Sequence, residues 1–110
     1  MRETEGNLCR FEDGLSPEGL RKFSLLLADR CSGAAAVLSG NDETGYRYAL
    51  ASAYGDVRSL GKELNRTFAG RGGGPSGLVQ GSLKGTREEL VRFFARTEVE
   101  IPAEKAGKQP

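Results

Sequence analysis

The 110-residue sequence contains no histidine and no tryptophan. Without an imidazole there is no general base for Ser-His-Asp or Cys-His catalysis, and zinc sites that use histidine are excluded. The two cysteines are too few for a zinc site built from four cysteines. We therefore expect no catalytic residue in this chain itself, no metal site and no cofactor.

Cysteine pairs and long apolar runs are also missing. Cys9 and Cys31 stand far apart, and neither belongs to a Cys-x-x-Cys pattern, so we expect reduced thiols and a cytoplasmic protein. No stretch of about 18 apolar residues is present, so we expect no transmembrane helix and no membrane partner. The first residues are polar and acidic, unlike a signal peptide.

Neither sign of charge dominates, because 16 basic and 15 acidic residues give a net charge of +1. This balance hides an uneven distribution. Residues 1–46 carry five basic and eight acidic side chains, whereas residues 47–71 carry five basic and two acidic ones, a local charge of +3. A basic segment of this kind indicates either a solvated helix face or a polyanion partner.

Three amphipathic stretches predict helices at about 17–31, 57–69 and 87–97. Ser16-Pro17 and Thr86-x-x-Glu89 are helix-start patterns at the first and third of these. In the first helix the apolar residues expected to face the core are Leu20, Phe23, Leu25, Leu26, Leu27 and Cys31.

Short apolar or alternating stretches predict strands at 7–12, 34–39, 46–53 and 78–83, the middle two as an antiparallel hairpin. The predicted fold is therefore α/β, a two- or three-layer single domain with a mixed sheet of about four strands. We expect this domain over residues 7–98, after a disordered lead-in at 1–6 and before a polar tail at 99–110.

Two groups of side chains on these elements are candidates for binding. Arg58, Lys62 and Arg66 recur every four residues and form one basic stripe along the second predicted helix. Tyr46 and Tyr48 share one face of a predicted strand, where they either pack in the core or stack on bases.

Residues 70–77 contain five glycines, three of them consecutive. The run lacks the Gly-Lys-Ser/Thr ending of a phosphate-binding Walker loop, and it leads from a helix into a strand, the reverse of a dinucleotide-binding turn. Bare amides could form a nest for a phosphate, with Arg71 beside it as a donor, or the glycines could serve only the geometry of the turn. The residues alone leave both interpretations open.

The glycine run and its surroundings resemble a known family, the DHH-associated domain. This domain closes the chain of alanyl-tRNA synthetases and of AlaX-type editing proteins, and it also occurs in DHH-superfamily phosphodiesterases. The resemblance covers about residues 8–96. The motifs that carry it are Gly70-Arg71-Gly72-Gly73-Gly74, Gln80-Gly81-Ser82, and the helix Asp56-Val57-Arg58-x-x-x-Lys62-x-Leu64-Asn65 that leads into them.

The resemblance implies a non-catalytic accessory domain that binds tRNA or another nucleic acid through its phosphate backbone. The sequence departs from the family at Pro75, where the phosphodiesterase version commonly has histidine, and at 74–77, where the synthetase version commonly runs Gly-Arg-Pro-Asp. It is closest to the synthetase type. The implied contact residues are Arg58, Lys62, Arg66, Gly70, Arg71, Gly72, Gly73, Gly74 and Gln80.

Two other functions stay open on the sequence. The chain could be a fragment of a DHH-type phosphodiesterase or of an AlaX-type aminoacyl-tRNA deacylase, with the catalytic domain of the parent protein as its partner. It could also be a mixed α/β regulatory or protein-interaction module whose glycine run serves only geometry. In the interpretation as a synthetase accessory domain, the parent protein is an alanine-tRNA ligase, and this domain assists aminoacyl-tRNA editing.

Overall fold

The computed structural model describes residues 6–53 and 55–96 of the chain. The helices are α1 (Pro17–Ala28), α2 (Arg58–Thr67) and α3 (Arg87–Arg96). The strands are β1 (Leu8–Phe11), β2 (Ala35–Asn41), β3 (Gly45–Ala51), β4 (Arg71–Gly73) and β5 (Leu78–Leu83). Of the predicted lead-in only Gly6 is described, and the predicted tail and the last predicted helix residue, Thr97, lie outside the described residues.

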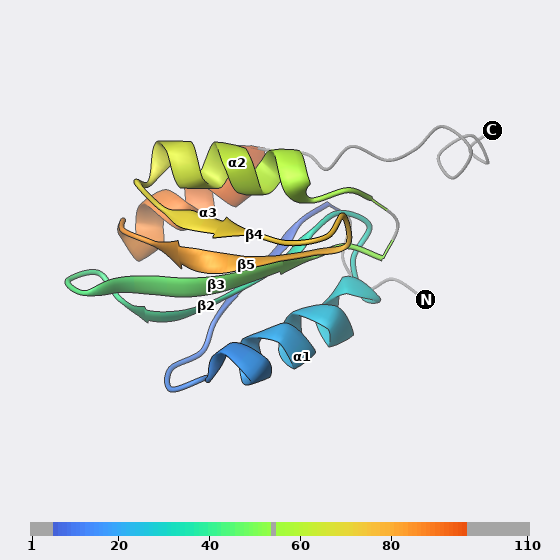
Figure 1. Ribbon diagram of the computed structural model, residues 1–110, viewed down its shortest axis with the longest axis horizontal. Helices are drawn as coiled ribbons and strands as arrows, with labels where there is room; N and C mark the ends of the chain where they lie inside the picture. The colour runs from blue at the N-terminus through green and yellow to red at the C-terminus, as the bar shows by residue number, and fades with distance from the viewer. Residues whose placement is uncertain (1–5, 54, 97–110) are drawn as a thin grey trace.

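The elements form three layers, with α1 on one face of a sheet and α2 and α3 on the other (Figure 1). The strand order is β1-β2-β3-β5-β4. β1 and β2 are parallel, joined by a crossover through α1, and the other neighbours are antiparallel. The mixed α/β fold is therefore confirmed, including the predicted β2–β3 hairpin.

Two of the helix starts form as their sequence patterns predict. The Ser16 hydroxyl oxygen accepts a hydrogen bond of 3.1 Å from the Gly19 amide, and Pro17 occupies the first helical position of α1. At α3, the Glu89 amide donates to the Thr86 hydroxyl and the Thr86 amide donates to the Glu89 carboxylate, at 3.2 and 3.1 Å. These reciprocal bonds satisfy amide groups that the first helical turn leaves free.

The alternation of strand residues divides the core into two apolar layers. Tyr46, Tyr48 and Leu50 of β3 face α2 and α3, and Ala49 and Ala51 face α1. The layer on the α2 side is the larger, and the residues that α2 and α3 contribute to it lie on the faces that the sequence predicted to be buried. These are Leu60, Leu64, Leu90, Phe93 and Phe94.

The predicted apolar face of α1 was too wide and the helix too long. α1 ends at Ala28, and Cys31 is buried beyond its end, beside the start of β2. Leu25 and Leu26 are 39% and 64% exposed, because successive helical residues turn by about 100° and Leu27 already occupies the side that meets the sheet. These two leucines cover no core surface.

Cys9 lies partly buried against the larger layer, and burial raises the pKa of its thiol to about 12. A thiol with this pKa stays protonated at neutral pH and is a poor nucleophile. No helix within the described residues is long and apolar enough to cross a bilayer.

Candidate nucleic-acid interface

The glycine run is the edge of the sheet. Its first half forms β4, the fifth strand, which pairs antiparallel with β5 where the sequence predicted a turn and about four strands. Glycine has low β-propensity, so composition could not indicate this strand. The paired residues are Arg71 with Ser82, Gly72 with Gly81, and Gly73 with Gln80.

Gly72 belongs to a row of residues that crosses the sheet on the side of α2. It lies opposite Gly81, which lies opposite Tyr48 in β3. A Cβ atom on Gly72 would lie 2.7 Å from the Tyr48 hydroxyl oxygen and would overlap the Gln80 carbonyl oxygen. The Tyr48 side chain therefore reaches across the two glycines. Its hydroxyl donates a hydrogen bond of 2.8 Å to Asn65 Oδ1 of α2.

A hollow of about 340 Å³ lies between β4 and the first half of α2. α2 approaches the sheet closely here, because a Cβ atom on Gly61 would lie 3.0 Å from a methyl group of Val79. Gly73 has open space where a side chain would be, whereas Gly74 has a φ of +156° that side chains disfavour. The charged residues lining the hollow are Asp56, Arg58 and Lys62.

The predicted basic stripe is present on α2, but two of its three cations already have a carboxylate partner. Arg58 donates to Asp56, with an ion-pair distance of 2.6 Å, and Arg66 pairs with Glu63. The Arg58 hydrogen bonds lower the pKa of Asp56 to about 2, and Asp56 raises the pKa of Arg58 in return. Lys62 forms no ion pair within the part of the chain that the structure describes.

Arg71 lies on the opposite face of the sheet from this stripe. It pairs with Ser82, which pairs with Arg47 of β3, and directly opposed residues share one face of a sheet. That face is the one on which α1 packs, since Ala49 of β3 also belongs to it. The structure thus brings Lys62 and Arg58 together with Gly72–Gly74, and it brings Arg71 together with Arg47.

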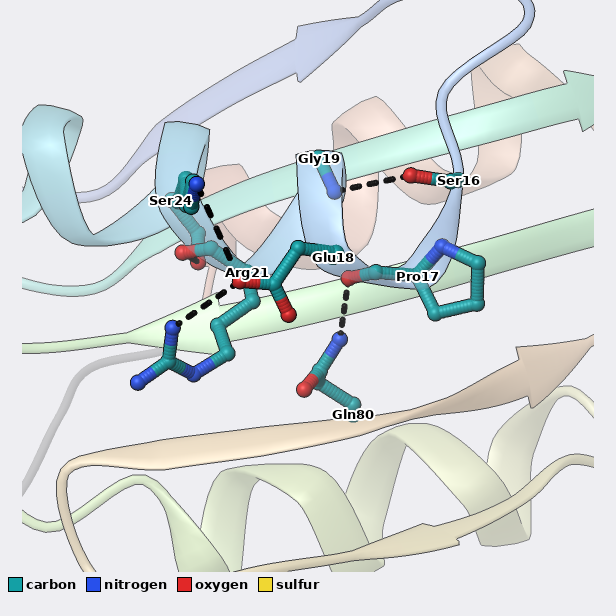
Figure 2. A network of polar contacts seen from close by, with 8 residues as sticks. Ser16, Pro17, Glu18, Gly19, Arg21, Ser24 and Gln80 are labelled. Atoms are coloured by element: carbon teal, nitrogen blue, oxygen red, sulfur yellow. Dashed lines mark hydrogen bonds and ion pairs between the residues drawn. The ribbon is translucent and has the colours of Figure 1, made fainter.

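Gln80, the last predicted contact residue, is engaged within the fold. Its amide nitrogen donates a hydrogen bond of 2.9 Å to the Pro17 carbonyl oxygen at the start of α1 (Figure 2). The same close view shows Ser16 capping α1 and the Arg21–Glu18 pair on its first turns. Gln80 therefore connects β5 to α1.

Tyr46 and Tyr48 are core residues. Tyr46 is 5% exposed and Tyr48 is fully buried, so neither presents a ring on which a base could stack. The Tyr46 hydroxyl donates a hydrogen bond of 2.6 Å to Asp42, which also accepts one of 2.9 Å from the Arg87 amide. Burial, followed by the Asp42 hydrogen bond, raises the pKa of Tyr46 to about 12. This arrangement ties the β2–β3 turn to the start of α3.

Sequence reasoning missed two cations on the face that carries Arg71. Arg47 and Lys84 both line a hollow of about 510 Å³ together with Arg71. The signal for Arg47 was present in the alternation of the strand, which sets an exposed arginine on the same side as buried alanines. Its closeness to Arg71 depends on the pairing of β3 with β5 and of β5 with β4, which alternation alone does not reveal.

Comparison with known proteins places the fold. No family model and no curated protein matches the chain. Among solved structures, the chain is similar to the C-Ala domain from Aquifex aeolicus alanyl-tRNA synthetase, with a TM-score of 0.63 and 16% sequence identity. The match covers 81% of this chain and 90% of the C-Ala chain. At this identity the similarity establishes that the two domains share a fold.

Proposed function

We propose that this chain is a non-catalytic accessory domain that binds tRNA or another nucleic acid, related to the C-terminal domain of alanyl-tRNA synthetases. The observation that carries the proposal is the shared fold with the C-Ala domain of such a synthetase, over most of both chains. The glycine motif at 70–74, which resembles the DHH-associated domain, supports the same assignment on separate grounds.

In this proposal the domain works in the cytoplasm beside a catalytic domain. An alanine-tRNA ligase is the favoured parent activity, because the structural relative is part of one. An AlaX-type aminoacyl-tRNA deacylase or a DHH-type phosphodiesterase is the alternative parent. In each case this chain contributes binding and another domain contributes the chemistry.

The predicted contacts on α2 are accessible to a phosphate backbone. Lys62 stands beside the β4 hollow without an ion pair among the described residues. Arg58 and Arg66 would exchange a carboxylate for a phosphate oxygen, and exposed ion pairs contribute only about 0–1 kcal/mol. The exchange is therefore inexpensive. Arginine is well suited to it, because its guanidinium forms two parallel hydrogen bonds to a phosphate.

A surface with few phosphate contacts binds weakly by itself. Non-specific nucleic-acid binding typically has a Kd of about 10⁻⁴ to 10⁻⁶ M at physiological salt. Phosphate contacts fix position and do not read sequence. We therefore expect weak binding with little sequence preference, which becomes effective when a tether raises the local concentration of the RNA.

A titration of fluorescently labelled bulk tRNA with the full chain, at about 50 and 200 mM salt, tests the proposal. We expect binding at the lower salt that weakens steeply at the higher one. The double variant Lys62→Gln/Arg66→Gln should reduce the magnitude of the negative slope of log K against log salt by about 1.4–1.8, because each lost contact removes about 0.7–0.9. An absence of binding at low salt would refute the proposed function. A slope that these two substitutions leave unchanged would refute only the role of the stripe.

A further inference from the structure

The face of the sheet that packs on α1 changes character halfway along its strands. At one end it is formed by Ala35, Val37, Ala49, Ala51 and Leu78, all in contact with α1 or partly buried beside it. At the other end, on the same face, the residues are Ser39, Arg47, Ser82, Arg71 and Lys84. We name these five residues the open sheet face.

The strand register brings the open sheet face together across four strands. Ser39 of β2 lies opposite Arg47 of β3, Arg47 lies opposite Ser82 of β5, and Ser82 lies opposite Arg71 of β4. Neighbouring strands lie about 4.8 Å apart, so the backbones at the two arginines are roughly 10 Å apart with Ser82 between them. Lys84 follows two residues after Ser82 and so lies on the same side. Side chains of this length can converge on one anion or reach two neighbouring ones.

None of the three cations has a counter-ion among the described residues. Arg47, Arg71 and Lys84 form no ion pair there, and no acidic side chain lines the 510 Å³ hollow that they share. Several arginines elsewhere on the surface do pair, as Arg92 does with Glu88 at 2.8 Å. Like charges gathered without a partner repel one another, and a bound anion removes that repulsion.

Hydroxyl groups complete the donor set. Ser39 accepts a hydrogen bond of 3.1 Å from the Leu15 amide, which fixes its oxygen and leaves its proton for an acceptor outside the fold. Ser82 is exposed between the two arginines. Guanidinium, ammonium and hydroxyl groups at close range are the donors that proteins use for phosphate oxygens.

We propose that the open sheet face is a second phosphate-binding surface of this domain, which holds the phosphodiester backbone of an RNA strand. The inference rests on the proposed nucleic-acid function. RNA is favoured because the cations span several neighbouring strands, as an extended polyanion requires. Among the residues that line the hollow, the one aromatic side chain is that of Tyr46, which is buried. The surface therefore contacts backbone without stacking bases.

This surface lies on the other side of β4 from the stripe on α2, so the two flank one edge of the sheet. Arg71, in the edge strand, belongs to the open sheet face. A strand of RNA that passes the edge can contact both surfaces, which adds contacts that the α2 stripe alone does not supply.

The test uses Arg47→Gln/Lys84→Gln in the full chain, with labelled bulk tRNA as the probe. We expect the magnitude of the negative slope of log K against log salt to decrease by about 1.4–1.8. The control is Lys22→Gln/Arg92→Gln, which removes the same charge from exposed sites on α1 and α3 and should change the slope much less. Arg47→Lys/Lys84→Arg keeps the charge and should retain the slope. Melting temperatures would show that all variants are folded.

Three results would overturn the inference. One is equal slopes for Arg47→Gln/Lys84→Gln and for the charge-matched control, while the wild-type chain still binds tRNA; the proposed function then stands without this surface. A second is binding of polyglutamate as tight as that of tRNA and equally sensitive to Arg47→Gln/Lys84→Gln, which assigns the surface to an acidic protein. The third is no tRNA binding at all, in which case the proposed function fails as well.

Discussion

The two neighbouring glycines of β4 should respond to alanine in opposite directions. At Gly72 a methyl group would lie 2.7 Å from both the Tyr48 hydroxyl oxygen and the Gly81 Cα atom, and it would overlap the Gln80 carbonyl oxygen. Two of these three obstacles are backbone atoms of β5, which cannot rotate away. At Gly73 a methyl group would meet nothing within 4 Å.

The expected magnitudes follow from these contacts. Overpacking in a tightly packed site costs about 1–3 kcal/mol of the free energy of unfolding, so Gly72→Ala should lower it by that amount. Each kcal/mol corresponds to roughly 4–8 °C in Tm for a domain of this size. Gly73→Ala should raise the free energy of unfolding by about 0.4–1 kcal/mol, because alanine restricts the unfolded chain more than glycine does.

Urea unfolding followed by far-UV circular dichroism measures both variants, and hydrogen exchange of the amides that donate across the β4–β5 ladder shows whether β4 stays paired with β5. If the strain is relieved by local detachment of β4, its amides exchange faster even where the global midpoint moves little. Equal effects of the two substitutions on both readouts would refute the steric account of the glycine motif.

Two further predictions concern the ends of α2. Ala69 has a φ of +53°, a left-handed conformation that disfavours residues with a Cβ atom, so Ala69→Gly should raise the free energy of unfolding by about 1 kcal/mol in urea titrations; an unchanged or lower midpoint would contradict this. Asp56 has its pKa lowered to about 2 by Arg58, so its contribution to stability is complete above pH 4 and is lost as the pH falls from about 4 to 2. Asp56→Asn should therefore show a shallower decline of the urea midpoint over that range than the wild type, whereas parallel declines would show that the pair does not contribute.

The parts of the fold that the sequence predicted are those with local causes. Ser16 and Thr86 begin their helices through hydrogen bonds to residues three positions away, and those bonds form in the structure. The alternation of β3 likewise sorted Tyr46 and Tyr48 from Arg47 correctly. Such signals depend on neighbours in the sequence, so reading along the chain recovers them.

The parts that it missed depend on partners far away in the chain. β4 is a strand because β5 supplies its hydrogen bonds, and its own residues, one arginine and two glycines, give no indication of it. For the same reason the sequence could not show that the predicted contact residues lie on two faces of the sheet. The stripe on α2 and Arg71 are close in sequence, yet the sheet separates them, since the register turns Arg71 toward Arg47.

The structure also changes what the glycine motif accounts for. Gly72 and Gly81 leave the space into which Tyr48 extends to reach Asn65, and Gly61 lets α2 lie against Val79. These contacts explain Gly72 and Gly81 of the motif by packing, without a ligand. What the motif provides for binding is then indirect. At this edge of the sheet, α2 with its cations lies on one face and Arg71 lies on the other. Bulkier residues at Gly72 or Gly81 would push α2, β4 and β5 apart. A substitution at Gly72 should for that reason weaken RNA binding through displacement of β4.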